Sequence, residues 1–200
     1  MRESVRYICL DTETTGANIQ SGHRVIDIGC VEIINGNFGK TYQTFINPER
    51  DIESGAQAVH GISVEFLADK PKFTEIVKEF LTFIEGGVLI IHNAPFDMKF
   101  LNNELSLCNL PEITNEIIDS LTIARKKYPG EKASLDALCK KFEIDLSSRT
   151  VHGALTDSLL LAQVFTKLSS GMEIHARQIK YIIDDNAVRH DYSNFNMKVV

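Results

Sequence analysis

The first half of the chain alternates short apolar runs with polar turns, a pattern that predicts β-strands. Apolar segments cover residues 5–10, 24–34 and 40–46, and a polar, turn-rich stretch over residues 11–22 separates the first two. Asn35-Gly36-Asn37 lies between the second and third segments and is typical of a hairpin, because Asn and Gly tolerate the positive φ angles of tight turns. We therefore expect the chain to open with a three-stranded antiparallel meander.

Beyond residue 70 the apolar residues recur at helical spacing. Phe73, Ile76 and Phe80 belong to a helix that should begin after Lys70-Pro71 and end at Gly86-Gly87. The fully apolar run over residues 88–91 is typical of a buried parallel strand, and a last short strand is expected over residues 117–119. Further helices are expected over residues 97–107, 121–127, 134–142 and 154–168. Together these elements predict an α/β fold, a mixed sheet of three antiparallel strands followed by parallel strands and flanked by helices.

The length of 200 residues suits one domain. We assign residues 1–170 to it and interpret residues 171–200, which are polar and mixed in charge, as a C-terminal extension. Apolar runs are shorter than the roughly 20 residues that span a bilayer, and the N-terminus lacks a signal-peptide pattern, so we expect a cytoplasmic protein with no membrane contact. The four cysteines show no C-x-x-C pairing and are predicted to be small buried residues in a reducing compartment.

Two carboxylates follow the first predicted strand, in Asp11-Thr12-Glu13-Thr14-Thr15-Gly16. Because strand residues alternate between faces, Asp11 and Glu13 point the same way and lie about 7 Å apart. Unpaired buried carboxylates are costly, and metal ligation is one way to satisfy them. A solvated loop with ordinary capping residues is the alternative that this stretch alone leaves open.

Four further polar residues stand in loops or at predicted element boundaries. Asp97 follows His92-Asn93-Ala94-Pro95-Phe96, where a buried strand runs into a helix, and it could simply favour the helix dipole. His152 and Asp157 lie five residues apart at the start of the last helix, so both can project towards one site, although in isolation the pair favours a surface histidine and a solvated aspartate. His60, in a loop between apolar residues, could anchor that loop or contact a ligand.

Considered together, these residues predict a metal site. Three aspartates and a glutamate, with a histidine beside them, form a hard-oxygen site that suits Mg²⁺ or Mn²⁺, without the cysteines or paired histidines typical of zinc. Two such ions about 3.5–4 Å apart are a known solution to phosphodiester hydrolysis. A histidine whose pKa is near 6.5 can take the proton of the attacking water. The net charge of −6 argues against a protein that coats nucleic acid, but not against one that holds a strand end through cations.

The order Asp-x-Glu, then Asp, then His-x-x-x-x-Asp resembles the DEDDh 3′–5′ exonuclease family, whose fold is ribonuclease H-like. The resemblance covers about residues 5–168, and within the family it looks nearest to the proofreading (epsilon) subunits of bacterial DNA polymerase III. The stretches that carry it are Asp11–Gly16, His23–Gly29, Val59–Ile62, His92–Asp97, Ser134–Cys139 and Arg149–Asp157.

The resemblance implies a role for each candidate residue. Asp11, Glu13, Asp97 and Asp157 would bind two divalent ions, Mg²⁺ or Mn²⁺, and His152 would be the general base. The pocket for the 3′-terminal nucleotide would be lined by Asp11, Glu13, Thr14, Thr15, His60, Asn93, Phe96 and Asp157. Phe96 could stack on a base or pack under its helix. Gly55 stands where epsilon subunits often carry an acidic residue.

The resemblance also implies binding partners, and it leaves two alternative functions open. The expected partners are DNA 3′ ends, the alpha subunit and other core subunits of DNA polymerase III, and the sliding clamp. We find no clear clamp motif in residues 168–182, and the chain stops soon after a polymerase-binding tail would begin. A 3′–5′ exoribonuclease is the first alternative, and a non-catalytic polymerase-docking module is the second.

Overall fold

The computed structural model describes residues 5–147, Arg149 and residues 151–170, together with the backbone of four short C-terminal strands. These strands form two separate ladders, one of β6 (Met172–Glu173) with β9 (Lys198–Val199) and one of β7 (Tyr181–Asp184) with β8 (Ala187–His190). The predicted extension over residues 171–200 falls on this part of the chain and, apart from these strands, lies outside the described residues.

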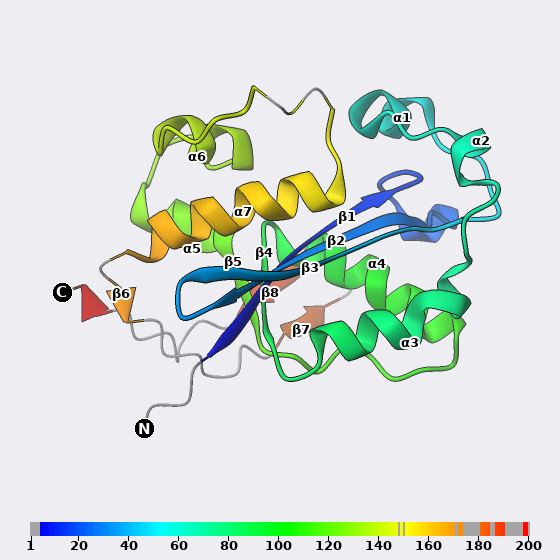
Figure 1. Ribbon diagram of the computed structural model, residues 1–200, viewed down its shortest axis with the longest axis horizontal. Helices are drawn as coiled ribbons and strands as arrows, with labels where there is room; N and C mark the ends of the chain where they lie inside the picture. The colour runs from blue at the N-terminus through cyan, green and yellow to red at the C-terminus, as the bar shows by residue number, and fades with distance from the viewer. Residues whose placement is uncertain are drawn as a thin grey trace.

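A five-stranded mixed sheet forms the centre of the molecule (Figure 1). Its strands are β1 (Arg6–Thr14), β2 (Val25–Ile34), β3 (Asn37–Phe45), β4 (Val88–Ile91) and β5 (Ile117–Asp119). They lie in the order β3-β2-β1-β4-β5, the first three antiparallel and the last two parallel to β1. The hairpin turn has positive φ at Asn35 (52°) and Gly36 (78°), as its sequence requires. The predicted meander and the parallel strands are therefore confirmed.

Strand β1 is longer than predicted. The strand was expected over residues 5–10, with Asp11 and Glu13 at its end keeping the alternation of strand residues, and β1 stays paired with β2 as far as Thr14 opposite Val25. Its pairing with the parallel strand β4 ends earlier, at Cys9 opposite Ile90. The carboxyl half of β1 thus extends beyond its parallel neighbour, and the carboxyl ends of strands are where open α/β sheets bind ligands.

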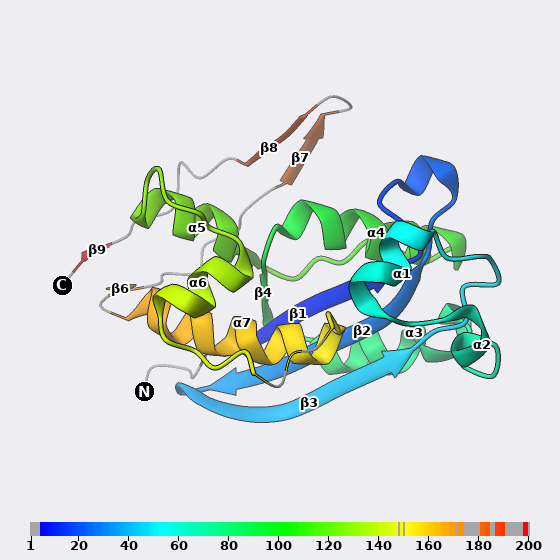
Figure 2. The same cartoon turned by 90° about the horizontal axis from the view of Figure 1, so that it is seen from above.

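Helices cover both faces of the sheet (Figures 1 and 2). Helices α3 and α4 pack on one face, and α5, α6 and α7 lie on the other. The helices are α1 (Ser54–His60), α2 (Val64–Leu67), α3 (Phe73–Ile84), α4 (Ala94–Leu107), α5 (Ser120–Lys127), α6 (Leu135–Lys141) and α7 (Ala154–Ser169), with a 3₁₀ turn η1 (Ile19–Ser21). Helix α4 begins three residues before its predicted start. No helix in the described part of the chain is long and apolar enough to cross a membrane.

The alternation of side chains along β1 explains the two layers. Ile8 and Leu10 are fully buried in the cluster formed with α3 and α4, whereas Cys9 is fully buried in the cluster formed with α7. The four cysteines are free thiols, and Cys9, Cys30 and Cys139 are buried as predicted, whereas Cys108 is only partly buried. Asp11 and Glu13 continue the Cys9 side of β1, so they project towards the face that α7 covers.

Candidate active site

The end of β1, the beginning of α7 and the end of α1 meet at one edge of the sheet, on the right in Figure 1. Asp11 is paired across the ladder with Gly29, and Glu13 with Asp27. Glu13, His152 and Asp157 each offer a ligand atom, and these atoms lie within 4.8 Å of one another. Residues more than 140 positions apart in the sequence therefore meet at a single site.

Helix α7 is fixed at its first turn by strand β2. The Asp27 carboxylate accepts a hydrogen bond from the Ala154 N–H (3.1 Å), and the Ser158 hydroxyl donates to the Gly29 carbonyl (2.8 Å). A Cβ at Gly29 would lie 2.1 Å from the Ala154 carbonyl carbon, so glycine is what lets α7 approach. This contact places Asp157, which is buried, over the end of β1.

Asp97 reaches the site from the other face. It lies in the first turn of α4, is buried, and accepts hydrogen bonds from both the backbone N–H (3.1 Å) and the hydroxyl (2.7 Å) of Thr12. Asn93 precedes the helix in the left-handed conformation (φ 72°), which turns the chain sharply from β4 into α4. The predicted convergence of Asp97 with the β1 carboxylates depends on this turn.

The carboxylates strongly perturb one another. Burial raises the pKa of Asp11 well above its usual range, and the charges of Asp97 and Glu13 add to this shift. Burial likewise raises the pKa of Glu13 to about 8, with contributions from Asp157 and Asp27. The pKa of Asp97 rises to about 7, because burial outweighs the hydrogen bonds from Thr12. Crowded, buried carboxylates of this kind are stabilised by bound cations.

The donor set fits hard divalent ions. Glu13 and Asp157 supply carboxylate oxygens, Asp11 lies beside them with a pKa that their charges raise, and His152 is the one nitrogen donor of the group. Oxygen-rich sites of this kind select Mg²⁺, Mn²⁺ or Ca²⁺ rather than zinc. The residues present are therefore suited to the ions that the sequence predicts.

The predicted substrate residues lie around the site in different ways. Thr14 is buried and its hydroxyl donates to the Gly16 carbonyl (2.8 Å). His60 is buried at the end of α1, where its Nδ1 accepts from the Ile62 N–H (3.0 Å). Asn93 is exposed at the start of α4, while Phe96 packs against Phe100 with ring centroids 4.9 Å apart. The packing role of Phe96 is thus realised, and its stacking on a base stays a prediction.

Thr15 takes part in an arrangement that superficially resembles a hydrolytic triad. Its hydroxyl lies 2.9 Å from His23 Nδ1, and His23 Nε2 lies 2.9 Å from a Glu53 oxygen. Thr15 is fully buried and its hydroxyl also accepts from the Arg24 N–H (3.0 Å), so no substrate can reach it in this conformation. We assign the trio a structural role, joining the end of β1 to the segment before α1. A nucleotide contact by the Thr15 side chain would require this segment to move.

The sequence did not assign site roles to two residues, Asp27 and Arg149. Asp27 anchors α7 and adds its charge to the cluster, and burial raises its pKa to about 6. Arg149 lies against Asp157 and His152 and supplies a positive charge inside the site. Both residues stand within stretches that carry the family resemblance, but their roles depend on how α7 packs, which local sequence does not reveal.

The family model RNase_T, described as Exonuclease, matches residues 8–165, a span that includes every carboxylate of the cluster. The chain belongs to the exonuclease family. Membership confirms the predicted 3′–5′ exonuclease and implies divalent metal ions as its cofactors.

Curated relatives of this exonuclease are DNA polymerase III epsilon subunits. The subunit of Rickettsia typhi is 53% identical over 175 residues, which cover 85% of this chain and 76% of the relative. The subunit of Escherichia coli K12 is 45% identical over 175 residues, covering 83% of this chain and 72% of the relative. The resemblance to epsilon subunits is thereby confirmed.

Solved structures agree with the fold. Exonuclease X in complex with 5′ overhanging duplex DNA is 27% identical, with a TM-score of 0.65 over 82% of this chain and 91% of that one. The nuclease domain of 3′hExo, a DEDDh family member bound to rAMP, is 19% identical, with a TM-score of 0.73 over 84% of this chain and 94% of that one. The predicted ribonuclease H-like architecture is therefore confirmed.

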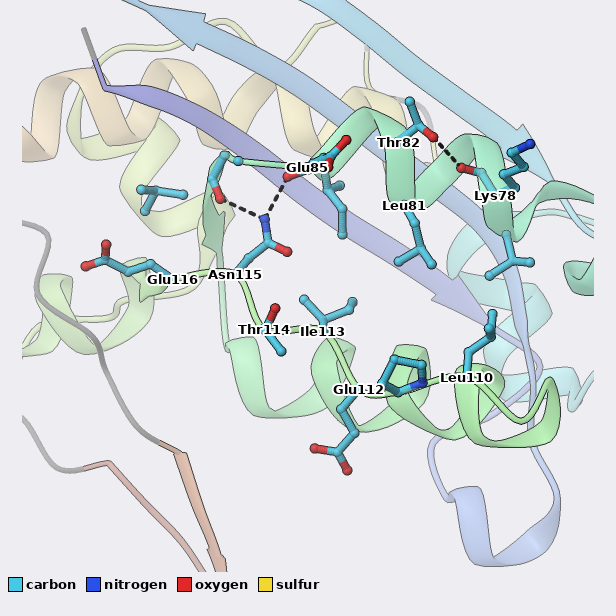
Figure 3. Close-up of a pocket in the computed structure, with 16 residues that line it drawn as sticks. Lys78, Leu81, Thr82, Glu85, Leu110, Glu112, Ile113, Thr114, Asn115 and Glu116 are labelled. Carbon is cyan, nitrogen blue, oxygen red and sulfur yellow. Dashed lines mark hydrogen bonds between the residues drawn. The ribbon is translucent and has the colours of Figure 1, made fainter. Parts of the chain in front are cut away.

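An open groove elsewhere on the exonuclease is distinct from the carboxylate site. It lies between α3 and residues 110–116 and has a cavity volume of about 900 Å³ (Figure 3). The Asn115 amide closes one end by donating to the carbonyls of Ile84 (2.7 Å) and Gly87 (2.8 Å). Since none of the four predicted metal ligands lines it, size alone does not mark the catalytic site here.

The raised carboxyl pKa values predict how the metal-free protein responds to pH. The folded protein keeps protons on Glu13 (pKa about 8) and Asp97 (pKa about 7) that the unfolded chain loses near pH 4 to 5. Their contribution to stability is therefore complete at low pH and is lost as the pH rises towards 8. We expect the melting temperature in EDTA to fall by about 5–10 °C between pH 5.5 and 8.5, measured by calorimetry. A melting temperature that rises over this range would contradict the assignment.

Proposed function

We propose that the exonuclease removes nucleotides from the 3′ ends of DNA with the help of two divalent ions, Mg²⁺ or Mn²⁺, as the proofreading subunit of a bacterial DNA polymerase III. The observation that carries the proposal is the convergence of the β1, α4 and α7 carboxylates beside His152 in a chain whose curated relatives are epsilon subunits. A cytoplasmic location follows from this role.

Asp11, Glu13, Asp97 and Asp157 are the residues we assign to metal binding. When bound, the ions would lower the pKa of a coordinated water and stabilise negative charge on the phosphate and the leaving oxygen. Asp97 is held by Thr12 on the α4 side, so its position is set before any ion arrives. The overall negative charge of the protein is consistent with a substrate held through cations rather than through a basic surface.

His152 is the residue we assign to proton transfer. Its Nδ1 lies 3.0 Å from an Asp157 oxygen, and its side chain is 44% exposed. The backbone N–H of His152 donates to the Val59 carbonyl (3.2 Å), which ties the histidine to the end of α1 next to His60. With Nδ1 directed at the carboxylate, Nε2 is the nitrogen that would accept the proton of water.

Replacing His152 with alanine should lower kcat by about 10²–10⁴-fold, the usual contribution of a general base. Metal binding should change much less, because the carboxylates remain. Single-turnover hydrolysis together with a calorimetric Mn²⁺ titration would separate the two effects. Turnover close to that of the unchanged protein would assign the base elsewhere.

The substrate is tested by comparing 3′ ends. A mispaired 3′ terminus on a DNA primer should be cut faster than a paired one, because an unpaired end costs less to separate from its partner strand. RNA and DNA oligomers of one sequence, with Mg²⁺, Mn²⁺ or EDTA, test the exoribonuclease alternative, since the 2′-OH is the group that differs. Equal rates on paired and mispaired primers would count against proofreading, and activity in EDTA would remove the metal mechanism.

The partners we propose are the alpha subunit and other core subunits of DNA polymerase III, and the sliding clamp. The support is the name of the curated relatives, which are subunits of that polymerase. Co-elution of the full chain with purified alpha subunit in gel filtration tests the assignment. Separate elution at micromolar concentration would contradict it.

A further inference from the structure

Arg149 places a cation directly against Asp157, one of the proposed metal ligands. Its guanidinium lies against both oxygens of Asp157, with Nη2 donating to Oδ2 (2.6 Å) and Nε in ion-pair distance of Oδ1 (2.6 Å). The Arg149 and Asp157 side chains are only 7% and 5% exposed. The arginine therefore contacts both of the oxygens that Asp157 would offer to a metal ion.

The same guanidinium reaches two further groups. Nη1 donates to the Asp136 carboxylate on α6, and Nη2 lies 2.7 Å from His152 Nδ1. Arg149 thus connects α6, the segment before α7 and the first turn of α7. A fork of donors on a planar group is suited to such simultaneous contacts, whereas a lysine would offer a single charge.

We propose that Arg149 is a positioning residue that takes the place of a cation on Asp157 until metal binds, and that metal binding displaces it. This inference rests on the proposed role of Asp157 as a metal ligand. Without a positive charge, Asp157 would be buried beside Glu13 and His152 as an uncompensated carboxylate. With Arg149 in place, Asp157 keeps its orientation, but an incoming ion must compete for the same oxygens.

The position of Arg149 also affects which ring nitrogen of His152 carries the proton. His152 Nδ1 lies 2.7 Å from Arg149 Nη2 and 3.0 Å from Asp157 Oδ2, and it can accept from the first or donate to the second, but not both. A guanidinium has donors and no acceptor, so whenever Nδ1 accepts from Nη2 the neutral ring carries its proton on Nε2. That tautomer cannot accept a proton at Nε2. Once Arg149 leaves, Nδ1–H can donate to Asp157 and Nε2 becomes the acceptor, so displacement of the arginine prepares the base.

Mn²⁺ affinity measured by calorimetry on the full chain tests the proposal. Arg149→Gln should bind Mn²⁺ about tenfold more tightly, because the competitor is gone. The melting temperature of this variant should be lower than that of the unchanged protein in EDTA, and the difference should shrink at saturating Mn²⁺. Arg50→Gln is the matched control, since Arg50 donates to the carbonyls of Ser21 and Asp51, and it should leave Mn²⁺ affinity unchanged.

A second variant separates the displacement of Arg149 from a general effect of protein charge on Mn²⁺ affinity. Asp136 is 50% exposed and contacts Arg149 from α6. Asp136→Asn loosens the anchor of Arg149 and should tighten Mn²⁺ binding, whereas the loss of a negative charge alone would weaken it. Weaker or unchanged binding in both Arg149→Gln and Asp136→Asn would overturn the proposal. Failure of the unchanged protein to bind Mn²⁺ would instead remove the proposed function.

Discussion

Replacing Asp11 with asparagine is expected to lower metal-dependent hydrolysis by about 10³-fold or more, since metal ligation contributes several kcal/mol and each 1.4 kcal/mol is a factor of ten. The same change should raise the melting temperature of the metal-free protein. Asp11 lies among the charges of Asp97, Glu13, Asp157 and Asp27, which raise its pKa together with burial. Removing it relieves that repulsion, and the gain should grow as the pH rises.

Initial rates on a mispaired primer and melting curves in EDTA at pH 6 and pH 8 would measure both effects. Asp69→Asn is the matched control, because Asp69 is an exposed carboxylate that pairs only weakly with the neighbouring Lys70. It should change neither rate nor melting temperature noticeably. A variant at Asp11 that retains normal hydrolysis would exclude this residue as a metal ligand.

Replacing Gly29 with alanine is expected to disrupt the docking of α7. The new Cβ would lie 2.1–2.3 Å from backbone atoms of Ala154 and Leu155, and backbone cannot swing aside as a flexible side chain could. Such overpacking costs about 1–3 kcal/mol or more. Because α7 carries Asp157, a displacement of about 1 Å should also cost roughly 10²-fold in turnover.

Urea unfolding and initial rates would quantify the change. Gly153→Ala is the control for stability, because its backbone is extended (φ −161°) and no atom lies within 4 Å of an added Cβ. That substitution should alter the free energy of unfolding by less than about 0.5 kcal/mol. If the two alanine variants were equally stable, the close approach of α7 to β2 would be wrong.

The order of strands and helices was predictable because apolar periodicity reports directly on local structure. The end of β1 was not. The stretch after Leu10 is polar and turn-rich, and although strand alternation predicted that Asp11 and Glu13 share a face, it did not show that pairing with β2 continues to Thr14 against the local propensity. The strand continues, and its alternation is what directs both carboxylates to the face that α7 covers.

The carboxylates that we propose as metal ligands stand out in the sequence for a different reason. Asp11, Glu13, Asp97 and Asp157 form a pattern whose chemistry is recognisable before any fold is known. The residues that hold them in place were not predictable, because Asp27, Gly29 and Arg149 act across the contact between β2, α6 and α7. No local spacing marks such a contact, and a single sequence carries no covariation that would reveal it.

The separation of the site residues along the chain has a consequence for biosynthesis. Asp11 and Glu13 emerge early from the ribosome, whereas His152, Asp157 and the α7 turn that docks on Gly29 emerge about 140 residues later. A nascent chain can form the antiparallel meander, and even the α3 and α4 layer, while it lacks a complete set of ligands. Because the proposed set of ligands is complete only with Asp157, we expect hydrolysis of nucleic acid to begin only after translation has passed α7.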